Sequence, residues 1–312
     1  MEDKSWRWVL VTAIAPIAWG STYYVTRQVL PADAPLWGAV IRCLPAGLLV
    51  LLLVRRLPRG SWWWRSFVLG TLTVGGLNVL VYVTAQLLPT SLAATLMSTS
   101  AAAMLLLSWL VLRQRPSLVA VLGALVGITG VVVIMGFGGG PVNGWGVVAS
   151  IGAMLSSSLG FVLTARWGAA VAPLTMPSWQ LVAGSLVVLP FALIVDGAPP
   201  AVDGPALAGF AYVILVATAL AYAAWFTGLA RLPGSVVGVI GLLNPVTGVA
   251  LGVFLAAEPF GILQAVGLLL VIAGVLLGVA VRRPRQPDAA RPPRAPSASP
   301  PGPRPCGNPA PR

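Results

Sequence analysis

Long, continuously apolar segments follow one another along the chain and are separated by short polar connections. The segments lack the strict alternation of apolar and polar residues that marks a β-strand. An α-helix needs roughly 20 apolar residues to cross the hydrocarbon core of a bilayer, and it satisfies its backbone hydrogen bonds internally. The pattern predicts ten transmembrane helices, at residues 8–27, 36–54, 66–87, 91–112, 118–137, 145–165, 174–195, 206–230, 235–256 and 261–281.

The ten segments fall into two sets of five. LPTSLAATL at 88–96 recurs as LPGSVVGVI at 232–240, an offset of 144 residues, and the same offset pairs Gly123 with Gly267 and Gly130 with Gly274. Because five is odd, the second set enters the membrane in the opposite direction to the first. We therefore predict an all-α integral membrane protein made of two inverted five-helix repeats, residues 1–137 and 138–281. Secondary transporters use such repeats and hold substrate near the membrane midplane between them.

Composition and charge support this topology. The chain is 58% hydrophobic and 8% charged, whereas soluble domains carry about 25% charged residues. If the N-terminus is cytoplasmic, every one of the 19 basic residues except Arg27 and Arg42 lies on the cytoplasmic side or in a cytoplasmic tail. This bias orients membrane proteins, so both termini are predicted to be cytoplasmic. The net charge of +12 then reflects topology, and nucleic-acid binding is not expected.

Residues 282–312 differ from the rest of the chain because proline and arginine dominate them. This composition predicts a disordered basic tail. We interpret it as a solvated segment that fixes topology, with contact to anionic lipid headgroups as the alternative.

Several classes of chemistry lack the residues that they need. The chain has no histidine and only two cysteines, Cys43 in an apolar segment and Cys306 in the tail. Histidine is the commonest general base and metal ligand, and no nucleotide-binding GxxxxGK loop occurs. We therefore expect no enzyme activity, metal site, cofactor or ATP-driven pumping.

Polar and aromatic residues inside the predicted spans are the candidates for solute binding, because polar groups there are expected to face a cavity or a partner helix. The candidates are Trp19, Thr22, Tyr23, Asn78, Tyr82, Gln86, Ser98, Ser157, Tyr222, Trp225 and Asn244. Alternatives stay open for each class. Hydroxyls can bond to their own helix, amides can join helices, and aromatic rings can simply pack in the core.

Arg42 is the one ionised side chain well inside a span. It lies roughly 9 Å from the outer end of its helix at 1.5 Å per residue, so it can extend to the membrane surface. Alternatively, it can bind a substrate carboxylate through a bidentate contact.

Glu258 follows the ninth span and precedes Pro259. At the repeat offset its counterpart is Gln114, which would face the cytoplasm. We interpret both as markers of the membrane edge, with Glu258 stabilised at the start of the tenth helix by the helix dipole. A proton-carrying Glu258 is the alternative. The glycines of the fifth and tenth spans, such as Gly123 and Gly274, are interpreted as packing faces or as contacts of a homodimer.

Three motifs resemble the EamA-type, ten-helix exporters of the drug/metabolite transporter superfamily. They are WGSTYYVTR at 19–27, VIRCLPAGLL at 40–49 and NPVTGVALGVFLAAEPFGILQAVGLLLVIAGVLL at 244–277. The last contains the Pro245 and Glu258 of the family pattern. The chain departs from this pattern at Gln114, where the family usually has glutamate, and at Ala101, where the second repeat has proline. These departures predict that the fourth and ninth helices bend differently.

The resemblance implies a multi-pass permease of the bacterial inner membrane that exports amino acids, related metabolites or drugs by alternating access, without a cofactor. Because no carboxylate lies deep in a span, we expect small neutral, zwitterionic or amphipathic solutes. The alternatives are multidrug or cation efflux by proton antiport, and a membrane scaffold or sensor that transports nothing.

Overall fold

A computed structural model of the protein describes residues 5–137, 142–167, 171, 172 and 174–280. Within these residues every regular element is helical. Nine of the described segments are long and apolar enough to cross a membrane, and α14 adds a shorter tenth. The prediction of ten helices in an all-α membrane protein is therefore confirmed. The predicted tail lies outside the described residues.

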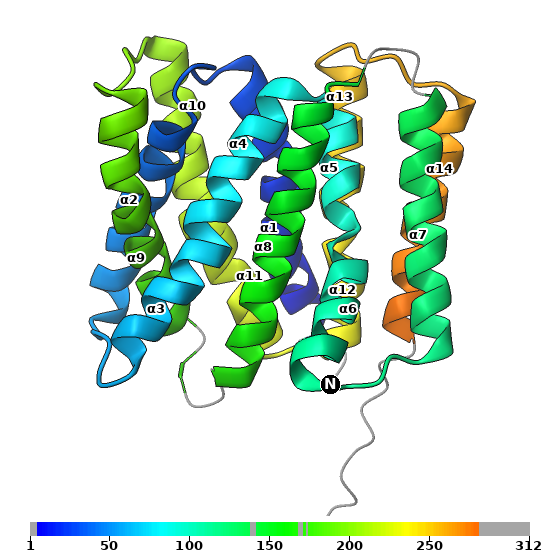
Figure 1. Ribbon diagram of the computed structural model, residues 1–312, viewed down its shortest axis with the longest axis horizontal. Coiled ribbons are helices and arrows are strands. Elements are labelled where there is room, and N and C mark those ends of the chain that lie inside the picture. The colour runs from blue at the N-terminus through cyan, green and yellow to red at the C-terminus, as the bar shows by residue number, and fades with distance from the viewer. Residues whose placement is uncertain (1–4, 138–141, 168–170, 173, 281–312) are drawn as a thin grey trace, which may run out of the picture. The chain divides into compact units, whose positions relative to one another are not determined.

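Four of the spans are divided into two α-helices each, and the π-helical turns are named η; Figure 1 labels the α-helices. In chain order the spans are α1 (Ser5–Gln28); α2 (Pro35–Val54); α3 (Trp62–Gly70), η2 (Thr71–Gly76) and α4 (Leu77–Leu87); α5 (Thr90–Ser98) and α6 (Ser100–Leu112); α7 (Leu118–Phe137); α8 (Gly144–Trp167); α9 (Thr175–Phe191) with η3 (Ala192–Asp196); α10 (Gly204–Ile214), η4 (Leu215–Leu220) and α11 (Ala221–Leu229); α12 (Gly234–Gly241) and α13 (Leu243–Phe254); and α14 (Ile262–Ala280).

The bundle buries many hydroxyl side chains among its apolar core residues and exposes large apolar side chains on its outer surface, as expected for a protein in lipid. Thr12, Thr90 and Ser158 are fully buried, whereas Leu53 and Phe254 are each 83% exposed. Large exposed apolar surfaces are unfavourable in water but match the apolar tails of lipids. Many of the buried hydroxyls find acceptors inside the bundle, for example Ser158, which donates to the Ser100 carbonyl, whereas Thr90 Oγ1 has no partner in the described chain.

The packing repeats itself between the two halves. Helix α1 of the first repeat packs against α11 and α13 of the second. Its equivalent in the second repeat, α8, packs against α4 and α6 of the first. Other large contacts join equivalent spans: α2 with α9, α7 with α14, and the fourth span, through α5, with the ninth, through α13. Helices α1 and α8 run in opposite directions (Figure 1). These contacts are those of two interleaved halves related by a pseudo-twofold axis.

The interruptions of the helices repeat as well. The π-helical turn η2 begins at residue 71 and η4 at residue 215, an offset of 144. The fourth span breaks between Ser98 and Ser100, and the ninth between Gly241 and Leu243, within one residue of that offset. The two spans are therefore interrupted at equivalent positions, and a difference in how they bend stays a prediction. The Thr99 hydroxyl bonds to the Leu96 carbonyl at 2.7 Å, and such back-bonding bends helices without proline.

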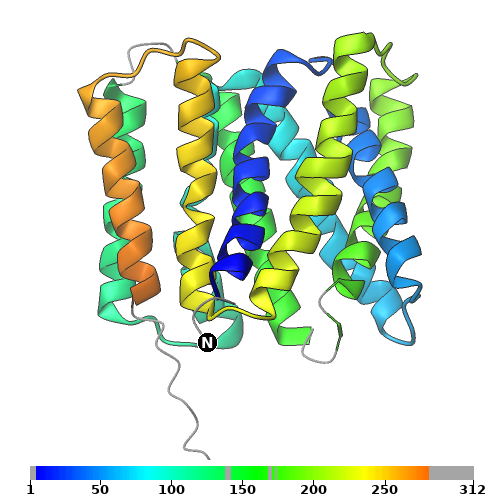
Figure 2. The same ribbon diagram turned by 180° about the vertical axis from the view of Figure 1, so that it is seen from behind.

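Helices α7 and α14 form a closely packed pair, seen together in Figure 2. A Cβ added at Gly130 would lie 2.5 Å from the Gly267 carbonyl oxygen, and one at Gly123 would lie 2.6 Å from the Gly274 carbonyl oxygen. Glycine lets the two backbones touch. The packing role predicted for these residues is confirmed within the chain, whereas a homodimer contact stays a prediction.

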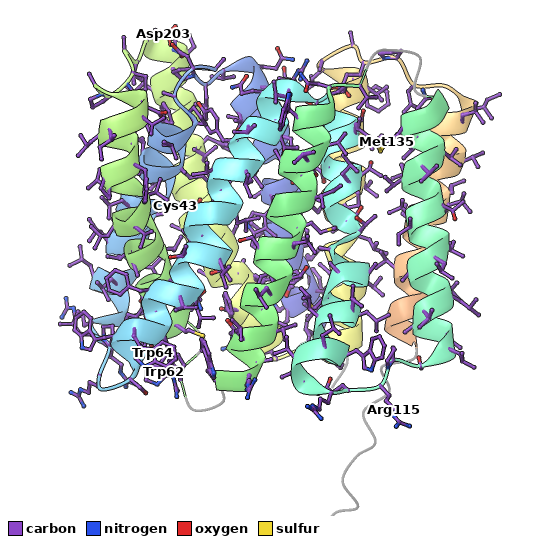
Figure 3. All side chains as sticks on the ribbon, viewed as in Figure 1. Cys43, Trp62, Trp64, Arg115, Met135 and Asp203 are labelled. Atoms are coloured by element: carbon purple, nitrogen blue, oxygen red, sulfur yellow. The ribbon has the colours of Figure 1, made fainter. Side chains whose placement is uncertain are left out.

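Charge separates the two ends of the bundle. Arg115, Trp62 and Trp64 lie at one end and Asp203 at the other (Figure 3). We call the first the basic end, which also carries the α2–α3 loop with Arg55, Arg56 and Arg59. The acidic end carries the α1–α2, α9–α10 and α13–α14 loops, with Asp33, Asp203 and Glu258. The prediction that both termini are cytoplasmic rests on this separation of basic from acidic residues.

Candidate functional site

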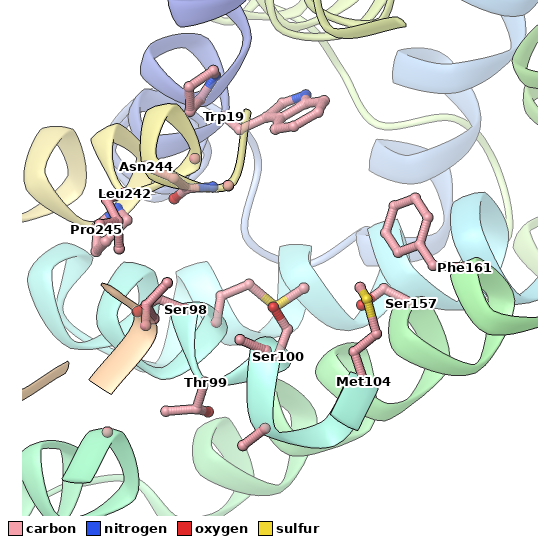
Figure 4. Close-up of a pocket in the computed structure, with 18 of the residues that line it drawn as sticks. Trp19, Ser98, Thr99, Ser100, Met104, Ser157, Phe161, Leu242, Asn244 and Pro245 are labelled. Carbon is pink, nitrogen blue, oxygen red and sulfur yellow. The ribbon is translucent and has the colours of Figure 1, made fainter. Parts of the chain in front are cut away.

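A cavity of about 400 Å³ lies between the two halves. Its walls come from nine of the ten spans, all except that of α9, and the break in the fourth span and the break in the ninth both reach it, through Ser98–Ala102 and through Gly241, Leu242, Asn244 and Pro245. Figure 4 shows Trp19, Asn244 and Pro245 on one side of this space and Ser98, Ser100 and Ser157 across from them. Helix breaks at the midplane expose backbone groups only where a cavity can use them.

Ten of the candidates for solute binding meet at this cavity. They are Trp19, Thr22, Tyr23, Arg42, Asn78, Ser98, Ser157, Tyr222, Trp225 and Asn244. They come from both halves and are separated by up to 225 residues of sequence. The structure thus brings these residues together, and their role in binding a solute stays a prediction.

Three aromatic side chains lie together in the wall of the cavity. The Trp19 ring lies 5.3 Å from the Trp225 ring and 5.9 Å from the Tyr222 ring, measured between centroids, and it meets Tyr222 edge to face. Tyr222 and Trp225 belong to α11, directly after the π-helical turn η4. Such a cluster gives a flat apolar surface with polar edges, suited to an aromatic or amphipathic solute.

Arg42 is the only charged residue among the lining residues that the structure describes. Its Nε donates to Thr218 Oγ1 at 2.9 Å, and its Nη2 donates to the Ala217 carbonyl at 3.3 Å. Both acceptors belong to η4, and Thr218 Oγ1 itself donates to the Val213 carbonyl. The side chain is therefore tied across the bundle and does not extend toward the membrane surface.

The polar groups of the wall differ in whether they already have a hydrogen-bond partner within the protein. Ser98 donates to the Thr95 carbonyl at 2.6 Å and Ser157 to the Met154 carbonyl at 3.1 Å. Asn78 Nδ2 donates to the Val74 carbonyl at 2.8 Å. In contrast, Asn244 Oδ1 is buried and has no hydrogen-bond partner in the described chain. A buried, unpaired amide oxygen is costly, so a solute that donates a hydrogen bond would be favoured there.

Two candidates do not line the cavity. The Tyr82 hydroxyl donates to the Pro31 carbonyl, and Gln86 Nε2 donates to the Thr26 carbonyl at 2.7 Å. Arg27 also bonds to carbonyls at the end of α4, including that of Leu88. These contacts tie α4 to the α1–α2 connection at the acidic end. Asn78, Tyr82 and Gln86 all belong to α4, but only its first part lines the cavity, through Leu77, Asn78 and Val81.

This difference gives a prediction for two tyrosines. Tyr82→Phe should lower the unfolding free energy by about 1 kcal/mol, the net value of one intramolecular hydrogen bond, and leave the KM of transport unchanged. Tyr222→Phe should leave stability unchanged and raise KM, because its hydroxyl has no hydrogen-bond partner in the described chain and its ring lines the cavity. Thermal unfolding in detergent and initial efflux rates measure the two effects. A changed KM in Tyr82→Phe would place that side chain in the solute path.

Glu258 caps a helix of the other half. Its carboxylate accepts hydrogen bonds from the Thr90 amide, the Ser91 amide and the Ser91 hydroxyl, the Ser91 amide at 2.9 Å. These groups form the start of α5, where unpaired amides favour a negative charge. The expectation that Glu258 caps the tenth helix is wrong, because α14 begins only at Ile262. Its counterpart Gln114 is exposed.

Other lining residues were not among the sequence candidates. Phe161, Phe226, Met97 and Met104 line the cavity, and so do glycines of α7 and α14, namely Gly123, Gly127, Gly274 and Gly278. Their types are indistinguishable from core packing in so apolar a chain. The described residues contain no group of three or more potential metal-binding side chains.

A model of the EamA-like transporter family matches residues 6–136 and, a second time, residues 144–280. The chain belongs to this family. It is 39% identical to the protein PecM of Dickeya dadantii over 240 residues, which are 76% of this chain and 80% of PecM. It is 29% identical to YedA of Escherichia coli K12, described as an uncharacterized inner membrane transporter, over 78% of this chain and 80% of YedA.

The fold of this EamA-like transporter also matches a solved structure. One crystal structure superposes with a TM-score of 0.61 at 20% sequence identity, over 88% of this chain and 96% of that one. At this identity the match shows the fold alone. Together with the family match, it makes the chain a membrane transporter by descent and a ten-helix bundle by architecture.

Proposed function

We propose that the protein is a permease of the inner membrane that exports small metabolites, such as amino acids or related zwitterionic or amphipathic solutes, by alternating access. The observation that carries the proposal is the cavity of about 400 Å³ between the two halves. Its volume suits a small organic solute, and its position between inverted repeats is where secondary transporters bind substrate.

The cavity lies toward the basic end. Its lining on α7 runs from Ala120 to Ile128, the half that begins at the basic end, and its lining on α14 runs from Val271 to Gly278, the half that finishes there. The acidic end is closed by the bonds of Arg27, Tyr82, Gln86 and Glu258. If the basic end is cytoplasmic, as charge distribution favours, this is an inward-facing form ready to receive a cytoplasmic solute.

Cation efflux by proton antiport has less support. The described lining contains no aspartate or glutamate to exchange a proton for a cationic solute. The Glu258 carboxylate accepts three hydrogen bonds at the acidic end instead of lining the cavity.

The proposal is tested by efflux from proteoliposomes loaded with amino acids and a mixed metabolite extract, analysed by mass spectrometry with and without imposed pH gradients. We expect at least one solute to leave faster than from protein-free liposomes, without dependence on the pH gradient. Efflux that follows the proton gradient would favour antiport. If no solute of a broad panel moves under any gradient, the transporter proposal fails and a scaffold is favoured.

A further inference from the structure

We propose that Arg42 forms an anion-binding subsite and that the transported solutes are amphipathic organic anions, with a carboxylate or similar group on Arg42 and an apolar or aromatic body in the rest of the cavity. The inference rests on the proposed transport function and narrows its solutes from zwitterionic or amphipathic metabolites to those with a net negative charge.

The first argument is the missing counter-charge. A guanidinium stays protonated in proteins, and a charge within a membrane span is costly and normally paired. The bonds of Arg42 in the described chain are to a hydroxyl and a carbonyl, not to a carboxylate. Asp196, Asp203 and Glu258 accept bonds from backbone amides at the acidic end. A solute carboxylate would supply the charge that the protein does not.

The second argument is the equivalent contact in the other half. There Gln180 of α9 accepts a hydrogen bond from the Thr73 hydroxyl of η2 at 3.1 Å, as Arg42 of α2 contacts Thr218 of η4. The α2–η4 contact and the α9–η2 contact are thus equivalent. Because the neutral amide of Gln180 is enough to connect α9 to η2, this contact does not need a charge. Only the first half has a charged side chain at this position, and Arg42, unlike Gln180, lines the cavity.

The third argument is the orientation of the guanidinium. Nε and one N–H of Nη2 are held by η4, which leaves the two N–H groups of Nη1 and the second of Nη2. These form the end-on fork that binds a carboxylate with two parallel hydrogen bonds. Because Thr218 is itself anchored on Val213, the fork is positioned before a solute arrives.

The rest of the wall sets the other features of the solute. The Trp19, Tyr222 and Trp225 rings offer an apolar surface, and Asn244 Oδ1 has no hydrogen-bond partner in the described chain. An ammonium group finds no carboxylate in the described lining and would be repelled by Arg42. The cavity should therefore favour anions over neutral molecules, and neutral molecules over cations.

Three probes that share an indole ring separate these cases: indole-3-acetate, indole-3-acetamide and tryptamine. Equilibrium dialysis of the purified full-length protein with radiolabelled probes measures binding independently of transport. We expect indole-3-acetate to bind about tenfold or more tightly than either analogue, the size of one charge-assisted contact.

The decisive variant is Arg42→Gln, because glutamine is the residue at the equivalent position of the second half, Gln180. It should stay folded, with a Tm lowered by no more than the loss of the bond to the Ala217 carbonyl explains, lose about tenfold or more in affinity for indole-3-acetate and keep its affinity for the amide. Arg115→Gln removes the same charge from the exposed α6–α7 loop and should leave the ranking intact.

The outcomes separate the two proposals. Equal affinities for the three probes, no binding of indole-3-acetate, or a ranking that survives Arg42→Gln would each overturn the anion subsite. If the liposomes still export a solute in those cases, the transport function stands without it. If the ranking depends on Arg42 but no solute moves, the subsite stands and the transport function fails.

Discussion

Replacing Gly241 by phenylalanine should reduce transport to below about one tenth of the wild-type rate while the protein still folds. Gly241 ends α12 at the break of the ninth span and lines the cavity. A Cβ built there would meet only the Trp225 ring, at 3.6 Å, which is ordinary van der Waals contact. The added ring would extend into empty space and occupy the site of the solute, so overpacking strain, typically 1–3 kcal/mol in a filled core, should be small.

The measurement is the efflux of whichever solute the liposome panel identifies, together with thermal unfolding of the purified variant. Gly144→Phe is the matched control, because Gly144 begins α8, is exposed, and a Cβ there meets nothing within 4 Å. It should transport normally. Wild-type efflux by a correctly folded Gly241→Phe protein would mean that the solute does not pass through this cavity.

The fold was largely predictable because lipid imposes one simple rule on the sequence. Each span must be apolar for roughly 20 residues, so the ten spans could be counted directly. The interruptions could not be located, because a π-helical turn such as η2 or η4 uses the same residues as a regular helix. Only their shared offset of 144 residues, seen once the structure is known, connects them to the repeat.

The site was predictable where a residue type is costly in a membrane. Arg42, Asn78 and Asn244 could be singled out because a charge or an amide in a span needs a reason, and all three line the cavity. Tyr82 and Gln86 satisfy the same rule with backbone carbonyls at the acidic end. Sequence alone could not separate these two solutions, because both place a polar group away from lipid.

Glu258 shows how two positions with matching local backbone differ in the contacts of their side chains. Ala257 has a left-handed conformation with φ of 52°, and its counterpart Arg113 has φ of 55°. The next amides also bond alike, Glu258 to the Gly252 carbonyl and Gln114 to the Ser108 carbonyl. Only the Glu258 side chain crosses to the other half. The bond that closes the acidic end is therefore absent from the described basic end, and this asymmetry favours the form open toward the basic end.

Glu258→Ala should consequently both destabilise the protein and loosen its acidic end. The variant leaves the Thr90 and Ser91 amides without their cap, at a cost of about 1–3 kcal/mol. Because the lost bonds belong to the closed acidic end, the equilibrium should shift toward the opposite form by about tenfold for each 1.4 kcal/mol. Thermal unfolding measures the first effect. The second is the labelling rate of a cysteine at Ser98 by a membrane-impermeant thiol reagent added from the outside, in a Cys43→Ser, Cys306→Ser background.

The control is Gln114→Ala, which alters the equivalent but exposed position and should change neither stability nor labelling. Glu258→Gln keeps one acceptor oxygen without the charge and should lie between wild type and Glu258→Ala in both measurements. Unchanged labelling in Glu258→Ala would show that the cap does not control access at this end. If Glu258→Gln instead keeps wild-type stability and labelling but abolishes efflux driven by a proton gradient, then Glu258 carries a proton, and its bonds to α5 are the resting state of a coupling site.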